Sequence, residues 1–480
     1  MANMTKIHNL AKNTSYLTLA LILQKIISFS YFALLARYLG PESLGQYYFA
    51  ISLTTIFAIL IDLGFANALT REIAKDQSRA SRYLGNVLSL KLPLSLLAVV
   101  LVAVTVHLMG TDILTRSLIY ISCISMVLDS FTTTFFAVSR GFHNLKYESI
   151  ASVIFQVIVL ASGCLALYLH WDLRYVMAAL SLASLYNFLY SFSILRRRLG
   201  VKIKLLYDRS IIKEIIGISW PFAGYAVTQR LYTYLDSILL TLLAGSVATG
   251  IYQVAFKIIF ALQFLPMAFT ASLYPALSYY WLNNRPQLQI TFERAINYLV
   301  IISLPIIAGS IALADRIVLI FKTAFSGATL PLQISIIALF FIFINFPIGS
   351  LLNACDRQGR NTLNMVIATV ASVLLNLWLI PRFQATGASI TVLATNFLMF
   401  ALGLRQVWKI IPYRPGHNLL ILAKAGLAAL LMGLAVFYGK NYLPLLGATL
   451  LGGVLYFAVL FCLRGFTKAD LLSIRQSFRL

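Results

Sequence analysis

Hydrophobic and polar positions divide the chain into about fourteen long apolar stretches with short polar breaks between them. Most of the stretches hold about 20 residues, the length that a helix needs to cross the hydrocarbon core of a bilayer. The breaks contain turn residues and charges, as at Gly40-Pro41-Glu42 and Arg196-Arg197-Arg198. The pattern predicts membrane helices over residues 14–36, 44–65, 84–109, 117–138, 148–169, 175–195, 215–243, 248–273, 295–313, 329–352, 361–380, 387–404, 418–437 and 442–463.

Composition supports the same class of protein. Hydrophobic residues make up 60% of the 480 residues and charged residues only 11%, where a soluble domain carries roughly 25% charged residues. The mean hydropathy is +0.85. We therefore expect an all-α integral membrane protein with about 14 transmembrane helices. Little chain is left for a large soluble catalytic domain.

The distribution of basic residues predicts the orientation in the membrane. With the N-terminus in the cytoplasm, 26 of the 38 Lys and Arg residues fall in cytoplasmic segments and 7 in outside loops. This bias follows the positive-inside rule, which accounts for the net charge of +23 without nucleic acid as a partner. We expect a multi-pass protein of the plasma (inner) membrane with both termini in the cytoplasm.

An internal repeat relates the two halves of the chain. At an offset of 205 residues, seven of the 27 positions from 24 to 50 are identical, including Gly40 with Gly245, Gly45 with Gly250, and Tyr47 with Tyr252. The first and seventh predicted spans enter from the same side, so the repeat is parallel, a recurring plan among transporters. The expected division is a six-helix lobe over residues 1–200, a second six-helix lobe over 201–410, and an appended helical hairpin with a cytoplasmic tail over 411–480.

Basic side chains deep in the predicted spans are the strongest candidates for a binding site. An ionisable residue in a span is costly and usually faces a cavity or a partner. Lys25 lies near the middle of the first span, and the repeat puts Arg230 at the same depth in the seventh. Lys257 is a third candidate for the same cavity. The substrate-binding candidates are Lys25, Arg230, Lys257, Gln24 and Gln229.

The remaining intramembrane charges are weaker candidates for substrate binding. Lys91 and Lys424 lie nearer the cytoplasmic ends of their spans, so we expect both to extend their ammonium groups to the interface. Asp62 also lies near that end, where an interfacial or capping role is expected. Asp129 and Asp236 are candidates for ion coupling, with neutralisation of a cavity lysine as the alternative for each.

Common catalytic motifs are missing from the sequence. It contains no Gly-x-x-x-x-Gly-Lys-Ser/Thr loop, no His-Glu-x-x-His pair and no nucleophile elbow. The five histidines are scattered, and the four cysteines have no metal-ligand spacing. We therefore expect a protein that is not an enzyme and that has no cofactor and no metal.

The segment around the first break resembles a known family. It reads Ala36-Arg37-Tyr38-Leu39-Gly40-Pro41-Glu42-Ser43-Leu44-Gly45-Gln46-Tyr47, and continues to Asp62-Leu63-Gly64-Phe65 and Thr70-Arg71-Glu72-Ile73-Ala74. This closely resembles the polysaccharide-biosynthesis transporters, the O-antigen-type oligosaccharide flippases. That family belongs to the multidrug/oligosaccharidyl-lipid/polysaccharide exporter superfamily, with the drug exporters and the lipid II flippases.

The resemblance implies a flippase that moves a polyprenyl-diphosphate-linked glycan from the inner to the outer leaflet. Glycosyltransferases or a glycan polymerase would be its protein partners. Two alternatives remain within the superfamily, a lipid II flippase and an exporter of small soluble solutes. A membrane enzyme of glycan assembly is a third alternative. The basic residues at Lys25 and Arg230 favour an anionic cargo, because they would repel a cationic drug.

Overall fold

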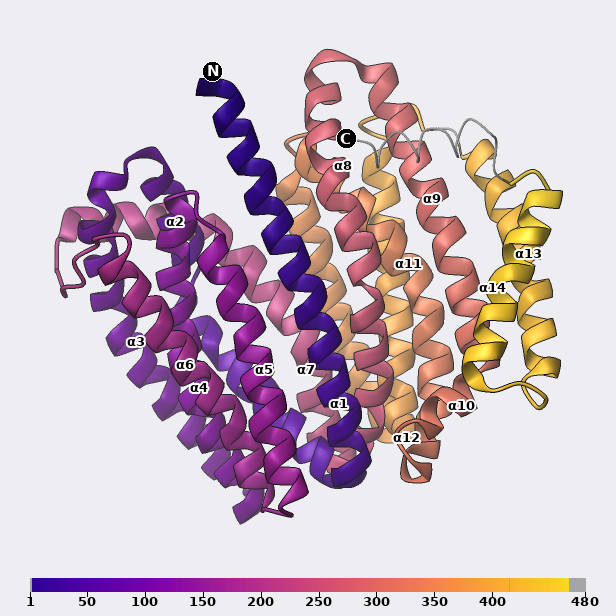
Figure 1. Cartoon of the computed structure of the whole chain (residues 1–480), viewed down its shortest axis with the longest axis horizontal. Coiled ribbons are helices and arrows are strands. Elements are labelled where there is room, and N and C mark those ends of the chain that lie inside the picture. The colour runs from indigo at the N-terminus through magenta and orange to yellow at the C-terminus, as the bar shows by residue number, and fades with distance from the viewer. Residues whose placement is uncertain (1, 414, 466–480) are drawn as a thin grey trace. The chain divides into compact units, whose positions relative to one another are not determined.

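The computed structural model describes residues 2–413 and 415–465, and for residues 2–18, 221 and 222 it describes the backbone alone (Figure 1). The predicted cytoplasmic tail lies largely outside this range. The described chain is almost entirely helical. Its α-helices are α1 (Ala2–Asp62), α2 (Phe65–Lys75), α3 (Ala80–Leu108), α4 (Ile113–Gly141), α5 (Lys146–Tyr168), α6 (Leu173–Arg197), α7 (Arg209–Leu262), α8 (Phe264–Asn283), α9 (Arg285–Ala312), α10 (Ala314–Leu319), α11 (Thr329–Ala354), α12 (Gln358–Val407), α13 (Gly416–Gly439) and α14 (Leu445–Cys462).

The described residues form 11 continuous helical segments that are long and apolar enough to cross a membrane. Three of these segments contain a non-helical residue, at Gly40 in α1, Gly245 in α7 and Gln384 in α12. Each such residue falls between two predicted spans and divides its segment in two. The fourteen predicted spans are thereby confirmed. The helices α2 and α10 are too short to cross a membrane and were not predicted.

The chain divides into two compact units, Met1–Gln253 and Val254–Leu480. In the first unit, α1 packs against α3, α4 and α5, and α4 packs against α6. An apolar core joins the amphipathic α2 to the neighbouring ends of α3, α4 and α6. This core contains the buried side chains of Phe65, Leu69, Ile73, Tyr83, Leu84, Phe135, Val138 and Leu195.

Hydrogen bonds hold the linker after α6, residues 201–208, against α3. The amide of Lys202 donates to Ser81 Oγ at 3.0 Å, and the amide of Leu206 donates to the carbonyl oxygen of Gly85 at 3.3 Å. Asp208 then accepts a 2.6 Å hydrogen bond from the Arg82 guanidinium. A side chain at Gly85 would collide with the backbone of the linker. The linker at the predicted boundary between the lobes is therefore fixed in position on α3.

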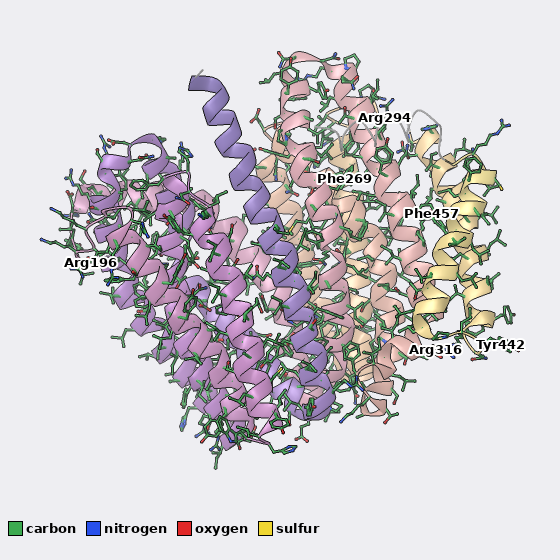
Figure 2. The ribbon with its side chains drawn as sticks, viewed as in Figure 1. Arg196, Phe269, Arg294, Arg316, Tyr442 and Phe457 are labelled. Atoms are coloured by element: carbon green, nitrogen blue, oxygen red, sulfur yellow. The ribbon has the colours of Figure 1, made fainter. Side chains whose placement is uncertain are left out.

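In the second unit, α9 packs against α11 and α13, and α11 packs against α12. The predicted hairpin of α13 and α14 lies against α9, where the Tyr456 hydroxyl donates to the carbonyl oxygen of Ile301 at 2.8 Å. Figure 2 shows Arg294 at one end of this unit and Arg316 and Tyr442 at the other. This separation agrees with the prediction that Arg294 lies on one side of the membrane and the other two residues on the opposite side, and which side is cytoplasmic stays a prediction. The three-part division of the chain stays a prediction.

The predicted repeat appears in the backbone itself. Gly40 has φ 75° and ψ 174°, and Gly245 has φ 85° and ψ 172°, a conformation open to glycine and strained for other residues. Both breaks therefore have the same shape. The first residues of α3 and α9, Ala80 and Arg285, are also separated by the repeat offset of 205.

Close contacts at the two breaks are reciprocal. A Cβ atom on Gly45 would overlap the backbone carbonyl of Ser246, and one on Gly250 would overlap the backbone carbonyl of Pro41. The repeat relates Gly45 to Gly250 and Pro41 to Ser246, so each contact is the image of the other. Two related segments that contact each other through equivalent residues have the local arrangement of a twofold axis.

Candidate functional site

Lys91 of α3 is the most completely buried cation among the described residues. Its side chain is 0% exposed. The ammonium group lies 3.0 Å from Asp62 Oδ1 at the end of α1. It also donates to two residues one turn apart on α4, reaching the carbonyl oxygen of Ser130 at 2.8 Å, its Oγ at 3.0 Å and Thr134 Oγ1 at 2.6 Å. Burial of an ammonium group is tolerated only with such partners.

Arg230 of α7 shares the same carboxylate. Its Nη2 lies 3.5 Å from Asp62 Oδ2, the oxygen that Lys91 does not contact. Asp62 stands where α1 ends, because Leu63 and Gly64 have positive φ and turn the chain into α2. We call Asp62, Lys91 and Arg230 the ion triad. Its formal charge is +1, so it can attract an anion.

The triad corrects two expectations. We expected Lys91 to extend to the interface and Asp62 to have an interfacial or capping role, and both expectations are wrong. Lys91 is enclosed by α1, α3 and α4, and Asp62 accepts from two cations. Depth along the span misled the interpretation, because it does not show toward which neighbours a helix turns a residue. The only signal in the sequence was the polar pair Ser130 and Thr134, four residues apart on one face of α4.

The five substrate-binding candidates are distributed over both units. Lys25 and Gln24 are half-buried in the first part of α1, Arg230 is half-buried, and Gln229 is exposed. Lys257 belongs to the second unit, where its ammonium group lies 5.9 Å from the Phe256 ring centroid. Of these five residues, Arg230 belongs to the ion triad. The roles of all five as substrate ligands stay predictions.

The two candidate coupling acids have different surroundings. Asp236 is 6% exposed and accepts a 3.3 Å hydrogen bond from the Tyr252 hydroxyl. In the first copy of the repeat, the equivalent residues are Tyr31 and Tyr47, so the acid is specific to the second copy. Asp129 is half-buried and, within the described part of the chain, forms no ion pair. Neither acid contacts Arg230 within salt-bridge distance in the described structure.

Apolar helices long enough to cross a membrane, arranged in a parallel repeat, are one of the recurring plans of membrane transporters. The model of the family described as "Polysaccharide biosynthesis protein" matches residues 10–281, more than half of the chain. The protein belongs to this family. A second family model, MatE, matches residues 221–381. The resemblance first seen around residues 36–74 is therefore confirmed.

Curated relatives extend over most of the chain. The capsular polysaccharide biosynthesis protein CapF of Staphylococcus aureus is 22% identical over 81% of this chain and 97% of its own. The probable low-salt glycan biosynthesis flippase Agl15 of Haloferax volcanii is 20% identical over 94% of this chain and 95% of its own.

Solved structures share the fold. The lipid II flippase MurJ in an inward closed conformation has a TM-score of 0.77 and 16% identity, over 92% of this chain and 97% of its own. An inward-facing multidrug resistance transporter of the MATE family has a TM-score of 0.65 and 16% identity, over 82% and 94% of the two chains. At this identity the likeness concerns the fold alone.

Proposed function

We propose that this protein is a flippase that carries a polyprenyl-diphosphate-linked oligosaccharide from the cytoplasmic to the outer leaflet. The observation that carries the proposal is the excess of positive charge in the membrane-spanning part of a family member related to glycan-biosynthesis proteins. Lys25 and Arg230 stand at equivalent positions of the repeat, and Lys91 adds a third cation beside Asp62. A diphosphate is the anionic group that such cations can bind through charge-assisted hydrogen bonds.

Transport would proceed by alternating access. In this mechanism the diphosphate and the sugars occupy a polar path through the protein, and the polyprenyl chain stays in lipid. Binding in the membrane excludes water, which strengthens each contact of a guanidinium or ammonium group with phosphate oxygens. Lys25, Arg230 and Lys257 are the proposed head-group ligands, with Gln24 and Gln229 as uncharged hydrogen-bonding partners. Asp129 and Asp236 are the proposed coupling acids, should an ion drive the cycle.

We infer that the protein acts in the plasma membrane with both termini in the cytoplasm. The lipid-linked substrate would be made there by glycosyltransferases, and a polymerase or ligase class of enzyme would receive it outside. The relatives named for capsular polysaccharide and glycan biosynthesis support this place in the reaction sequence.

The experiment is translocation in vesicles with the purified protein. A fluorescent polyprenyl-diphosphate oligosaccharide is placed in the vesicle leaflet that corresponds to the cytoplasmic leaflet of the cell. Its arrival in the opposite leaflet is followed by a lectin or a membrane-impermeant quencher. Lys25→Ala and Arg230→Ala should each lower the rate at least tenfold, because a charge-assisted contact contributes about 1.5–3 kcal/mol. Lys25→Arg keeps the charge and should keep most of the rate. Normal transport by the double alanine variant would overturn the proposed site.

The same vesicles separate the alternatives. Lipid II in place of the oligosaccharide tests the lipid II flippase, and an organic cation tests the drug exporter. Transport of the cation with no transport of either lipid would reject the proposal. A transferase assay on the purified protein tests the alternative of a membrane enzyme, which predicts new glycosidic bonds in the absence of any transport.

A further inference from the structure

The ion triad holds its carboxylate by two contacts of unequal quality. Lys91 is fully enclosed, and three oxygen atoms of α4 hold its ammonium group beside Asp62 Oδ1. Arg230 makes one contact with Asp62 Oδ2, at 3.5 Å, and its side chain is 33% exposed. A contact of that length is at the outer limit for an ion pair with hydrogen bonding. Lys91 is therefore a fixed partner of Asp62, and Arg230 is an exchangeable one.

The repeat distinguishes Arg230 from the other two members of the ion triad, because only Arg230 has a charged equivalent in the other copy. The basic position of Arg230 has a basic equivalent, Lys25, in the other copy. The positions equivalent to Asp62 and Lys91 are Met267 and Ile296, which are both apolar. Asp62 ends α1, whereas Met267 lies inside α8, and Ile296 lies inside α9. The acid and its fixed cation are therefore features of the first copy alone, and the packing of the second copy does not depend on them.

We propose that Asp62 is an internal counter-ion, which occupies Arg230 in the absence of substrate and which the substrate diphosphate displaces. The proposal rests on the proposed function. A guanidinium group binds carboxylate and phosphate oxygens through the same fork of donors, so one anion can replace the other. Lys91 makes the exchange possible. When Arg230 leaves, Asp62 keeps its buried partner, and no uncompensated carboxylate remains in the membrane.

The exchange makes Asp62 a determinant of specificity. An anion must attract Arg230 more strongly than the carboxylate does before it can bind. A diphosphate carries roughly two negative charges, whereas a sugar carboxylate or a diester phosphate carries one, so the second charge decides the competition. Asp62 thereby excludes single-charged lipid head groups, which are abundant in the bilayer, from a site that stays open to a lipid diphosphate.

The test measures binding of soluble prenyl probes to the full-length protein in nanodiscs. The probes are farnesyl diphosphate, the singly charged monophosphate diester farnesyl methyl phosphate, and uncharged farnesol. The main variant is Asp62→Asn with Lys91→Met, which removes the competing carboxylate and its cation together. We expect it to bind farnesyl diphosphate about two- to fivefold more tightly than the wild type, the range expected for loss of a partly exposed ion pair. Its preference for the diphosphate over the monophosphate diester should narrow.

Two further variants connect the effect to Arg230. In an Arg230→Gln background, the Asp62→Asn and Lys91→Met changes should leave the dissociation constant unchanged, because the exchange partner is gone. Asp62→Glu keeps all charges and extends the carboxylate toward Arg230, so it should weaken binding of the diphosphate. This variant preserves the buried pair and serves where the neutral double variant fails to fold.

The matched control is Glu148→Gln. Glu148 pairs with Arg140 at 3.0 Å, and its side chain is 23% exposed where that of Asp62 is 17% exposed. It should leave the affinity for farnesyl diphosphate unchanged. Equal or weaker binding by the neutral double variant, with clear binding by the wild type, would overturn the exchange and leave the proposed function standing. So would a gain that persists without Arg230. Wild-type protein that binds the diphosphate no better than farnesol would overturn both proposals.

Discussion

Replacement of Gly45 or Gly250 by alanine should destabilise the protein through the reciprocal contact of the two breaks. A Cβ atom on Gly45 would overlap the carbonyl of Ser246, and one on Gly250 would overlap the carbonyl of Pro41. Both obstacles are backbone atoms, which cannot rotate away as a side chain can. The segments would have to separate, and small residues at membrane helix contacts are favoured because they permit such close approach.

The magnitude follows from two opposing effects. Overpacking of a close contact costs about 1–3 kcal/mol. Alanine in place of glycine returns up to about 1 kcal/mol in a helix interior. We expect a net loss of about 1–2 kcal/mol for each variant, and a melting temperature that is lower by about 1–2 °C for a cooperative unit of this length. The two contacts belong to one junction, so separation caused by the first substitution relieves the second, and the double variant should lose less than the two single losses together.

The assay is thermal unfolding of the purified protein in detergent, with Gly217→Ala as the matched control. Gly217 is a helical glycine of α7, and a Cβ atom there meets nothing within 4 Å. The control should be as stable as the wild type or slightly more stable. If Gly45→Ala melts with the control, or if the two losses are fully additive, the reasoning from a shared backbone contact is refuted.

Two more predictions concern the orientation and the linker. Cysteine at Glu42 or Tyr442 should react with a membrane-impermeant maleimide from outside, and cysteine at Ser78 or Ser210 only after permeabilisation; the reverse pattern would refute the orientation. The hydrogen bond from Arg82 lowers the pKa of Asp208, so this contact stabilises the linker above the ordinary pKa of aspartate and is lost as the pH falls through the lowered value. Hydrogen exchange of residues 202–208 should therefore show equal protection at pH 7 and pH 5, and Asp208→Asn should reduce that protection at both.

Much of the fold was predictable because its determinants are local. A run of about 20 apolar residues specifies a span by itself, and the paired glycines at 40 and 245 marked both breaks. The ends of α8 and α9 were not predicted, because they extend the helices beyond the apolar runs. There, Leu277, Leu288 and Phe292 are buried among more polar neighbours. The helical periodicity of these residues extends over too few turns to predict a helix next to the long apolar stretches.

The candidate site was predictable only in part. The repeat pointed to Arg230 through its equivalent Lys25, and the structure puts Arg230 in an ion cluster. The partner of Arg230 could not be found from the sequence, because Asp62 is 168 residues away and belongs to another helix. Asp236 on its own helix was the nearer acid, but it bonds to Tyr252. Contacts between helices depend on rotation and packing, which the apolar pattern of a membrane helix records weakly.

A further prediction is that the membrane potential drives transport. The diphosphate carries roughly two negative charges, and a potential that is negative inside pushes them outward by about 2.3 kcal/mol per charge per 100 mV across the whole field. After release, the site keeps an excess of positive charge from Lys25 and the ion triad. The same potential favours the return of this empty site to the cytoplasmic side. Both halves of the cycle would then run downhill without ATP.

The competing hypothesis is antiport through Asp129 or Asp236. Vesicles with a potassium gradient and valinomycin impose a potential without a pH or sodium gradient, and translocation of the labelled lipid-linked saccharide is followed as the potential is varied. The voltage mechanism predicts a rate that rises with an inside-negative potential and that survives Asn substitution at both acids. A rate that ignores the potential but follows a pH or sodium gradient would reject it. In that event, loss of the gradient dependence in one Asn variant identifies the coupling acid, because only the acid that binds the ion can transmit the gradient.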